Sequence, residues 1–217
     1  YLQSLQSPFI GLELNTPQNP YSNLNSSLKA GNEGNHPNSN NNSTNVYYGL
    51  DAFGGGNCDA SGPQCVYHKN TGVGYQILYE NGVGDFNVAM GYQAMYSNTE
   101  GLNNIGIGYQ GLYSNSTGSE NTGVGYGVLY NNTTGDNNIA MGYRAMNSNT
   151  TGSGSVGIGY EALYTATTEG SLTAIGYQAA KANTTGTGTV AVGYRSLYSN
   201  TTGSQNNAIG YQALYTN

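Results

Sequence analysis

Aliphatic, small and polar residues alternate along most of the chain in a pattern with a constant 17-residue period. From residue 70 to residue 217 each unit contains a Gly-Tyr pair, which begins at Gly74, Gly91, Gly108, Gly125, Gly142, Gly159, Gly176, Gly193 and Gly210. We call the units coils and number their positions from 1 to 17, with Asn70 at position 1. A constant period predicts a repeat architecture, because a winding chain keeps like positions in register only if every turn has the same length.

Each coil is too short to fold alone. Its two aliphatic side chains contribute about 1.5–3 kcal/mol each on burial, against about 1–2 kcal/mol for every residue that is ordered. Coils must therefore stack, and the sequence predicts an all-β fold, a parallel β-solenoid (β-roll) of 17-residue coils. Position 4 is aliphatic in every coil, and we predict that it forms the core ladder: Val73, Met90, Ile107, Val124, Met141, Ile158, Ile175, Val192 and Ile209.

Two details of the coil stay open at this level. The stretch Tyr-Gln-Ala-Leu-Tyr-Ser-Asn fits either a strand or one helical turn per coil, and a stretch this short cannot decide between them. Gly or Ala at position 3 and Gly at position 5 flank the aliphatic residue. They predict either a flat strip for packing against another chain or a tight bend inside the coil. Asn-Thr-Thr-Gly, as in residues 132–135, predicts a turn.

The regular pattern weakens over residues 155–181. Leu172 takes the place of the Asn at position 1, Glu169-Gly170 displaces the turn glycine, and Ala180-Lys181 replaces Leu-Tyr. The period is kept, so we predict a continuous stack whose weakest part lies here.

The residues before the repeat form two further segments. Residues 1–44 predict a strand followed by an irregular Asn/Ser-rich arm. The strand (Phe9, Ile10, Leu12, Leu14) pairs either with its own solenoid or, in self-assembly, with a neighbouring subunit. Residues 45–69 predict a degenerate first coil, because the distance from Gly49 to Gly74 is one period plus an insertion of eight.

The insertion contains the only two cysteines, Cys58 and Cys65. Placed close together on either side of a Ser-Gly-Pro turn, they predict a disulfide and hence an oxidising, extracellular location. The alternative, a metal pair, has only His68 as a further ligand nearby.

The composition excludes several classes of function. Only 7% of the residues are charged and the net charge is −6, so five basic residues cannot form a patch for nucleic acid. No apolar stretch is long enough to enter a membrane, and the amino terminus has no signal-peptide pattern. Titratable residues are scattered, which predicts no catalytic site, no metal and no cofactor.

Asparagine and tyrosine columns supply the remaining candidate sites. Asn-x-Ser/Thr sequons predict either N-glycosylation or, within the repeat, a ladder of stacked amides; they include those that begin at Asn25, Asn41, Asn42, Asn115, Asn132, Asn149, Asn183 and Asn200. The tyrosines of position 10 predict either structural packing or an exposed platform for stacking sugars; they are Tyr79, Tyr96, Tyr113, Tyr130, Tyr164, Tyr198 and Tyr215.

The paired threonines also suggest ice binding. Adjacent residues on a strand point in opposite directions, however, so the pairs would not form one flat threonine face.

The unit Asn-x-Ala-Ile-Gly-Tyr-Gln-Ala-Leu-Tyr-Ser-Asn-Thr-Thr-Gly resembles the head repeats of trimeric autotransporter adhesins. It also resembles the longer repeats of bacteriophage and viral tail fibres and of bacterial surface fibres. Residues 191–203 and 206–217 carry it almost intact. The resemblance implies a left-handed parallel β-roll, commonly trimeric, that serves as a stiff stalk or adhesive head.

Together these observations predict a non-enzymatic subunit of an extracellular fibre, whose main partners are copies of itself, in a trimer or an end-to-end fibril. The repeat stops at position 12 without a polar cap, so we expect either that the natural chain continues or that the open edge docks onto another copy. The alternative function is a carbohydrate-binding module that uses the tyrosine ladder on surface glycans.

Overall fold

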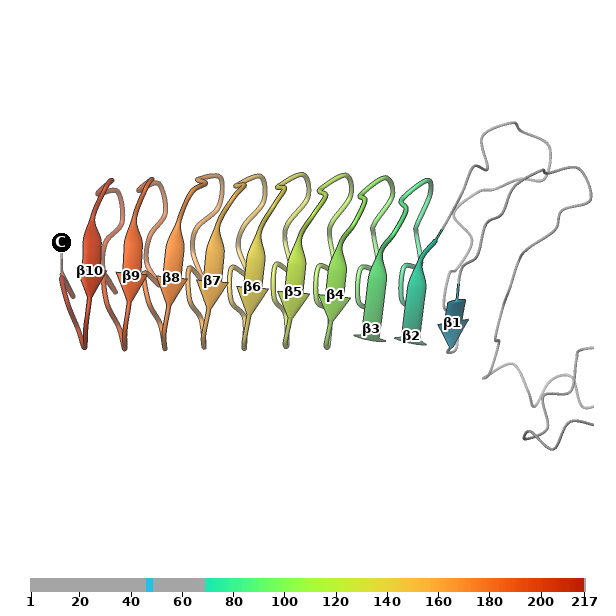
Figure 1. The fold of residues 1–217 in the computed structure, drawn as a ribbon, viewed down its shortest axis with the longest axis horizontal. Coiled ribbons are helices and arrows are strands. Elements are labelled where there is room, and N and C mark those ends of the chain that lie inside the picture. The colour runs from blue at the N-terminus through green and yellow to red at the C-terminus, as the bar shows by residue number, and fades with distance from the viewer. Residues whose placement is uncertain (1–45, 49–68, 217) are drawn as a thin grey trace, which may run out of the picture.

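The computed structural model of the chain describes residues 46–48 and 69–216, and this part is a parallel β-solenoid (Figure 1). Ten strands form one sheet in chain order, and every neighbouring pair is parallel. Each coil contributes one strand and closes through turns. The strands are β1 (Val46–Tyr48), β2 (Thr71–Tyr75), β3 (Val88–Tyr92), β4 (Ile105–Ile107), β5 (Thr122–Val124), β6 (Ile139–Met141), β7 (Val156–Ile158), β8 (Thr173–Ile175), β9 (Val190–Val192) and β10 (Asn207–Ile209).

The register of the strands follows the sequence period. Val73 pairs with Met90, and Met90 pairs with Ile107, so like positions lie over one another along the rod. The same shift of one period per strand continues to β10, also through the irregular coils of residues 155–181. Strand β1 joins β2 with Tyr48 opposite Val73. This longer shift is the offset expected from the degenerate first coil and its insertion.

The segment after the Gly-Tyr pair is neither strand nor helix. Among the described residues there is no helix at all, and positions 7 and 9 have positive φ in every coil, for example 52° at both Gln93 and Met95. Backbone N–H groups here donate along the axis: that of Leu78 to the Ala94 carbonyl at 3.1 Å and that of Glu80 to the Tyr96 carbonyl at 2.8 Å. The turn segments therefore form a second hydrogen-bonded ladder, opposite the sheet.

The glycine at position 5 is required by contacts inside the chain. Its φ lies between 123° and 144° in all nine coils, a region that L side chains rarely adopt. A Cβ on Gly108 would lie 2.1 Å from the carbonyl oxygen of Gly125 in the next coil. The positive φ fits the alternative of a bend within the coil, and the absence of a side chain allows successive coils to stack closely.

Small and apolar side chains of positions 3, 8 and 9 fill the interior. Leucine or methionine at position 9 is the largest contributor, as in Leu112, Leu129 and Met146, which have no more than 1% of their surface exposed. Position 3 is Gly or Ala because its side chain points at position 9: a Cβ on Gly106 would lie 2.6 Å from Cγ of Met95. The core is thus narrow, and it is continuous from coil to coil.

Several sequence-based predictions fall outside the described residues. These are the arm of residues 1–44, its strand (Phe9, Ile10, Leu12, Leu14), the sequons at Asn25, Asn41 and Asn42, and the cysteines Cys58 and Cys65.

Candidate functional site

The position-4 residues form a ladder in register, but the prediction that this ladder is the core is wrong. Val73, Met90, Met141, Ile175 and Ile209 are exposed, with 46% of the surface accessible at Met90, and the other four are half-buried. Side chains alternate across a strand, so when the small residue at position 3 points inward, positions 2 and 4 must point outward. The narrow interior is already filled by position 9, which leaves the aliphatic residue on the surface.

Positions 2 and 4 of strands β2 to β10 together make an outward-facing band, which we call the outer strip. It consists of Val, Ile, Met and Thr, with one Asn at Asn207. Positions 2 to 6 carry no charged residue in any of the nine coils, although the whole chain has a net charge of −6. An uncharged aliphatic band along the full rod is unusual for a protein surface that remains in water.

Tyrosines of position 6 stand beside the outer strip in an unbroken column, which we call the first tyrosine row. Neighbouring rings are nearly parallel, with centroids 4.8–5.3 Å apart and planes inclined by 5–16°. From Tyr92 to Tyr194 each residue is 37–43% exposed. For Tyr160, burial, the negative charge of Glu161 and the neighbouring tyrosines raise the pKa of the phenol above its ordinary value.

The tyrosines proposed as sugar platforms, at position 10, form a second row. Tyr79, Tyr96, Tyr113 and Tyr130 stack at 5.0–5.1 Å, as do Tyr198 and Tyr215 at 5.0 Å. Asn147 and Lys181 interrupt the row on either side of Tyr164. All of these tyrosines are half-buried. Within each stack, the ring faces between neighbouring tyrosines are occupied and are not open to a sugar.

Two columns of asparagine run through the interior. At position 12, the Asn115 Nδ2 donates to the Asn98 Oδ1 and to the Gly118 carbonyl, both at 2.8 Å. At position 1, the Asn104 backbone N–H donates to the Asn87 Oδ1 at 2.9 Å. Each amide thus joins two coils, and these hydrogen bonds satisfy polar groups that would be costly to bury unpaired.

The position-12 column decides between the two interpretations of the repeat sequons. Asn115, Asn132, Asn149, Asn183 and Asn200 are completely buried, and the Nδ2 atom to which a glycan would be attached already donates within the ladder or to the turn glycine. The ladder is therefore confirmed, and glycosylation of these five residues in the folded chain is contradicted.

The position-12 ladder is broken once, where Ala166 replaces asparagine. The Oδ1 of Asn149, in the preceding coil, is buried and has no hydrogen-bond partner. The same coil has Glu169 in place of the turn glycine. At Gly135, a Cβ would lie 2.3 Å from the Gly152 carbonyl oxygen of the next coil and 2.5 Å from the Asn132 Oδ1 of its own coil, so a side chain at position 15 is crowded by both. Both irregularities, Ala166 and Glu169, lie in the same coil.

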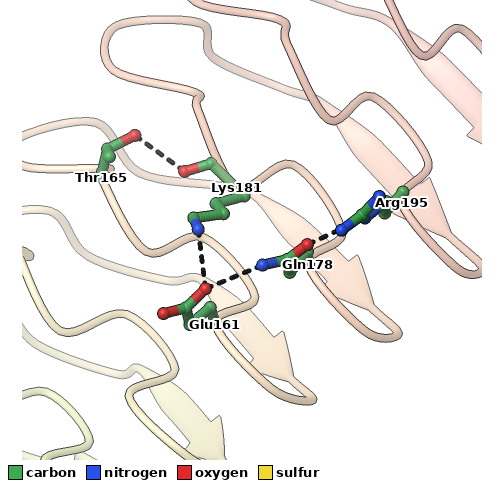
Figure 2. A network of polar contacts seen from close by, with 5 residues as sticks. All are labelled: Glu161, Thr165, Gln178, Lys181 and Arg195. Carbon is green, nitrogen blue, oxygen red and sulfur yellow. Dashed lines mark hydrogen bonds and ion pairs between the residues drawn. The ribbon is translucent and has the colours of Figure 1, made fainter.

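A charged network spans the coils next to this break (Figure 2). Lys181 Nζ lies 2.7 Å from Glu161 Oε2, and Gln178 Nε2 donates to the same oxygen at 2.9 Å. Arg195 Nε in turn donates to Gln178 Oε1 at 2.9 Å, and the Thr165 hydroxyl donates to the Lys181 carbonyl at 2.8 Å. The network ties three successive coils together in the region where the asparagine ladder is missing.

Acidification is expected to remove the contribution of this network. Burial opposes ionisation of Glu161, but hydrogen bonds from Lys181 and Gln178 and the charges of Lys181 and Arg144 hold the pKa of its carboxyl below the usual 4.5. A lowered pKa in the folded state adds stability above pH 4.5, which is lost as the pH falls through the folded value. Urea unfolding should therefore show wild type to be about 1 kcal/mol more stable than Glu161→Gln at neutral pH, with the difference vanishing in acid.

The matched control for this experiment is Glu120→Gln, which removes the same charge from an exposed turn. A Glu161→Gln variant whose stability differs from wild type by the same amount at all pH values would contradict the assignment.

The described residues offer little other chemistry. Within residues 46–48 and 69–216, no group of three or more His, Cys, Asp or Glu gathers where a metal ion could bind, and no helix in this part is long and apolar enough to cross a membrane. The surface features that stand out are therefore the outer strip and the two tyrosine rows.

Comparisons with protein-family models, curated proteins and solved structures find no match. The resemblance to autotransporter heads and tail fibres stays a prediction, and the function has to be argued from the geometry of the chain.

Sequence reasoning missed the outer strip and the first tyrosine row as surfaces, although it identified the residues. One signal could have located them: position 3 is never larger than alanine, which fits a residue crowded against the interior, and position 4 must then face outward.

Proposed function

We propose that the chain is a non-enzymatic structural subunit of an extracellular fibre, and that copies associate side by side through the outer strip. The observation that carries this proposal is an uncharged band of aliphatic side chains, exposed in six of the nine coils and half-buried in the others, along the rod. With strands about 4.8 Å apart, the sheet from β1 to β10 is about 43 Å long. A rod of identical coils is suited to act as a spacer or stalk.

The repeat of the strip argues that its partner is a second copy of the chain. Aliphatic side chains of position 4 project once per coil, at the spacing of the strands. Only a partner with the same axial period can match these projections along the whole length, and another copy has that period by construction. Because the strip is uncharged, two copies that each carry a net charge of −6 can meet there without opposing like charges.

The extracellular location is part of the proposal. It rests on the spacing of Cys58 and Cys65 and on the oxidising environment that a disulfide between them requires.

The proposal is tested by placing charges on the strip. Met90→Glu, Met141→Glu and Ile175→Glu together put three carboxylates on exposed strand positions. We expect wild type to sediment as an oligomer at micromolar concentration and the triple variant to sediment as a 22.7 kDa monomer with an unchanged circular dichroism spectrum.

Thr117→Glu, Thr134→Glu and Thr151→Glu provide the matched control. These residues are exposed at position 14, where another coil already has Glu100, and the change in net charge is the same. The control is expected to assemble like wild type. A monomeric wild type, or a strip variant that still assembles, would reject side-by-side association.

Carbohydrate binding through the second tyrosine row has less support. Sugars stack on the faces of aromatic rings, and in Tyr96, Tyr113 and their neighbours these faces contact the ring of the next coil. The one ring without a tyrosine neighbour in its row, Tyr164, has Lys181 Nζ at 5.8 Å from its centroid.

A further inference from the structure

The coils repeat with a second, longer period of three coils. We number the coils from 1 to 9, starting at residue 70. Coils 1–3 and coils 4–6 have the same residues at positions 3, 4 and 9, and equivalent residues lie three strands apart in one register. The matching pairs are Gly72 and Gly123, Val73 and Val124, Leu78 and Leu129, Ala89 and Ala140, Met90 and Met141, Met95 and Met146, Gly106 and Gly157, Ile107 and Ile158, and Leu112 and Leu163.

Packing in the interior explains part of this longer period. A Cβ on Gly106 would lie 2.6 Å from Cγ of Met95, and a Cβ on Gly157 would lie 2.6 Å from Cγ of Met146. The methionine of one coil thus goes with a glycine in the next coil.

Interior packing does not explain position 2, because side chains at this position point outward into the outer strip. Threonine occurs here in every third coil, whereas the other six coils have Val or Ile, or Asn207 in coil 9. The threonines are Thr71, Thr122 and Thr173, in coils 1, 4 and 7.

The hydroxyls of these three threonines form no hydrogen bond within residues 46–48 and 69–216. Threonines in the turns differ, since the Thr133 hydroxyl, for example, donates to the Thr150 carbonyl at 3.0 Å. Association through the outer strip would remove the three strip hydroxyls from solvent. A covered hydroxyl without a partner is costly, so each one needs a polar group opposite it.

We propose that Thr71, Thr122 and Thr173 set the register in which two copies of the chain associate, with threonine coils facing threonine coils. This inference rests on the side-by-side association proposed above and identifies the residues that decide its register. Packed sheets lie about 10 Å apart, which leaves room for one water that bridges two facing hydroxyls.

The even spacing of the threonine coils restricts the possible registers. Two parallel copies match only at shifts of whole three-coil units, about 14 Å each. At a shift of three coils, Met90 faces the coil of Met141, as it does its own coil when there is no shift. A shift of one coil places every threonine against an aliphatic coil. A shift of two coils pairs Thr173 with Asn207 but leaves the other threonines unmatched. Antiparallel copies follow the same rule, because the order of coils 1, 4 and 7 can be reversed.

Methionine supplies a probe of the register. Photo-methionine, which carries a diazirine, is incorporated at Met90 and Met141 on the strip, in coils 2 and 5, and at the buried Met95 and Met146. These chains are mixed with 15N-labelled chains that lack the diazirine, and the mixture is irradiated. Mass spectrometry then maps links that join peptides of different isotope content, which are links between chains.

We expect links from Met90 and Met141 to coils 2, 5 and 8 of the partner chain if the copies are parallel, or to coils 3, 6 and 9 if they are antiparallel. In both cases the threonine coils 1, 4 and 7 should receive less than about a tenth of the links, because that pairing would bury hydroxyls against aliphatic side chains. The buried Met95 and Met146 should give no links between chains.

Thr71→Val, Thr122→Val and Thr173→Val together remove the hydroxyls with little change of shape. Association is expected to persist, but links to coils 1, 4 and 7 should rise to about a third, the share of these three coils in a random register.

The matched control is Thr117→Val, Thr134→Val and Thr151→Val, which makes the same chemical change at exposed turn residues. The distribution of links in this control should equal that of wild type.

The two proposals fail in different ways. A wild-type oligomer with links spread evenly over all coils, or a strip threonine variant with the wild-type distribution of links, would overturn the register proposal and leave side-by-side association intact. A wild type that sediments as a monomer and gives no links between chains would reject both.

Discussion

Gly108→Ala is expected to split the coil stack and to reduce the stability of the chain by more than about 4 kcal/mol, a range reached by few single substitutions. The new Cβ would lie 2.1 Å from the Gly125 carbonyl oxygen and 2.7 Å from its carbonyl carbon. Both are backbone atoms that cannot rotate away. At φ 125° the alanine backbone is itself strained by about 1–3 kcal/mol. Relief requires the coils to separate, which breaks the hydrogen bond from Gly125 N–H to the Ile107 carbonyl.

Gly111→Ala is the matched control, a little further along the same coil. Here a Cβ would meet its nearest atoms at 3.5 Å, an ordinary contact, and five of the nine coils already have alanine at this position. The variant should be as stable as wild type or gain about 0.4–1 kcal/mol from the reduced freedom of the unfolded chain. Urea unfolding and far-ultraviolet circular dichroism measure both variants. Equal behaviour of the two would show that close stacking at position 5 is not required.

Asn132→Ala is expected to be the second most damaging change, at about 2–4 kcal/mol. It removes the hydrogen bonds from Asn132 Nδ2 to the Asn115 Oδ1 and the Gly135 carbonyl, and it takes away the acceptor of Asn149 Nδ2. The Asn115 Oδ1 is then buried without a donor. Each net hydrogen bond contributes about 1 kcal/mol, and an unsatisfied buried group costs about 1–3 kcal/mol. Amide hydrogen exchange should accelerate first in the coils of residues 115–149.

Two further variants separate the ladder from a general effect of losing asparagine. Asn131→Ala removes one hydrogen bond, to the Asn147 carbonyl, at a half-buried position where another coil has Ala182. It should lose less than about 1 kcal/mol. The reverse experiment is Ala166→Asn with Glu169→Gly, which gives the Asn149 Oδ1 a donor and should stabilise the chain. If Asn131→Ala were as damaging as Asn132→Ala, the ladder would not be the cause.

The sequence was sufficient to predict the solenoid, the period and the register, because all three follow from counting residues between glycines. It also indicated the asparagine ladder at Asn115 and Asn132, where amide stacking was one of two alternatives. It predicted a weak part within residues 155–181, and the missing amide at Ala166 lies there. The network of Glu161 and Lys181 spans the same coils, although its partners could not be paired before the fold was known.

The core was assigned to the wrong side of the strand for a physical reason. Hydrophobicity alone favours burial of Ile107 over Gly106, but the coil is so narrow that only glycine or alanine fits beneath the position-9 side chain.

The backbone conformation of positions 7 and 9 could not be predicted from the sequence either. In a sequence, a residue with positive φ is normally recognised because it is glycine, but here positive φ occurs at Gln93 and Met95. The backbone strain at these residues is offset by burial of the position-9 side chain and by hydrogen bonds to the next coil.

The orientation of the backbone hydrogen bonds has a mechanical consequence. They point along the rod, from each coil to the next, so a pulling force on the two ends loads every junction in series. Adding coils then lengthens the rod without strengthening it, and the tensile limit is that of its weakest joint. The Asn149 Oδ1 has no donor in the next coil. The junction between these two coils is therefore the one expected to rupture first under tension.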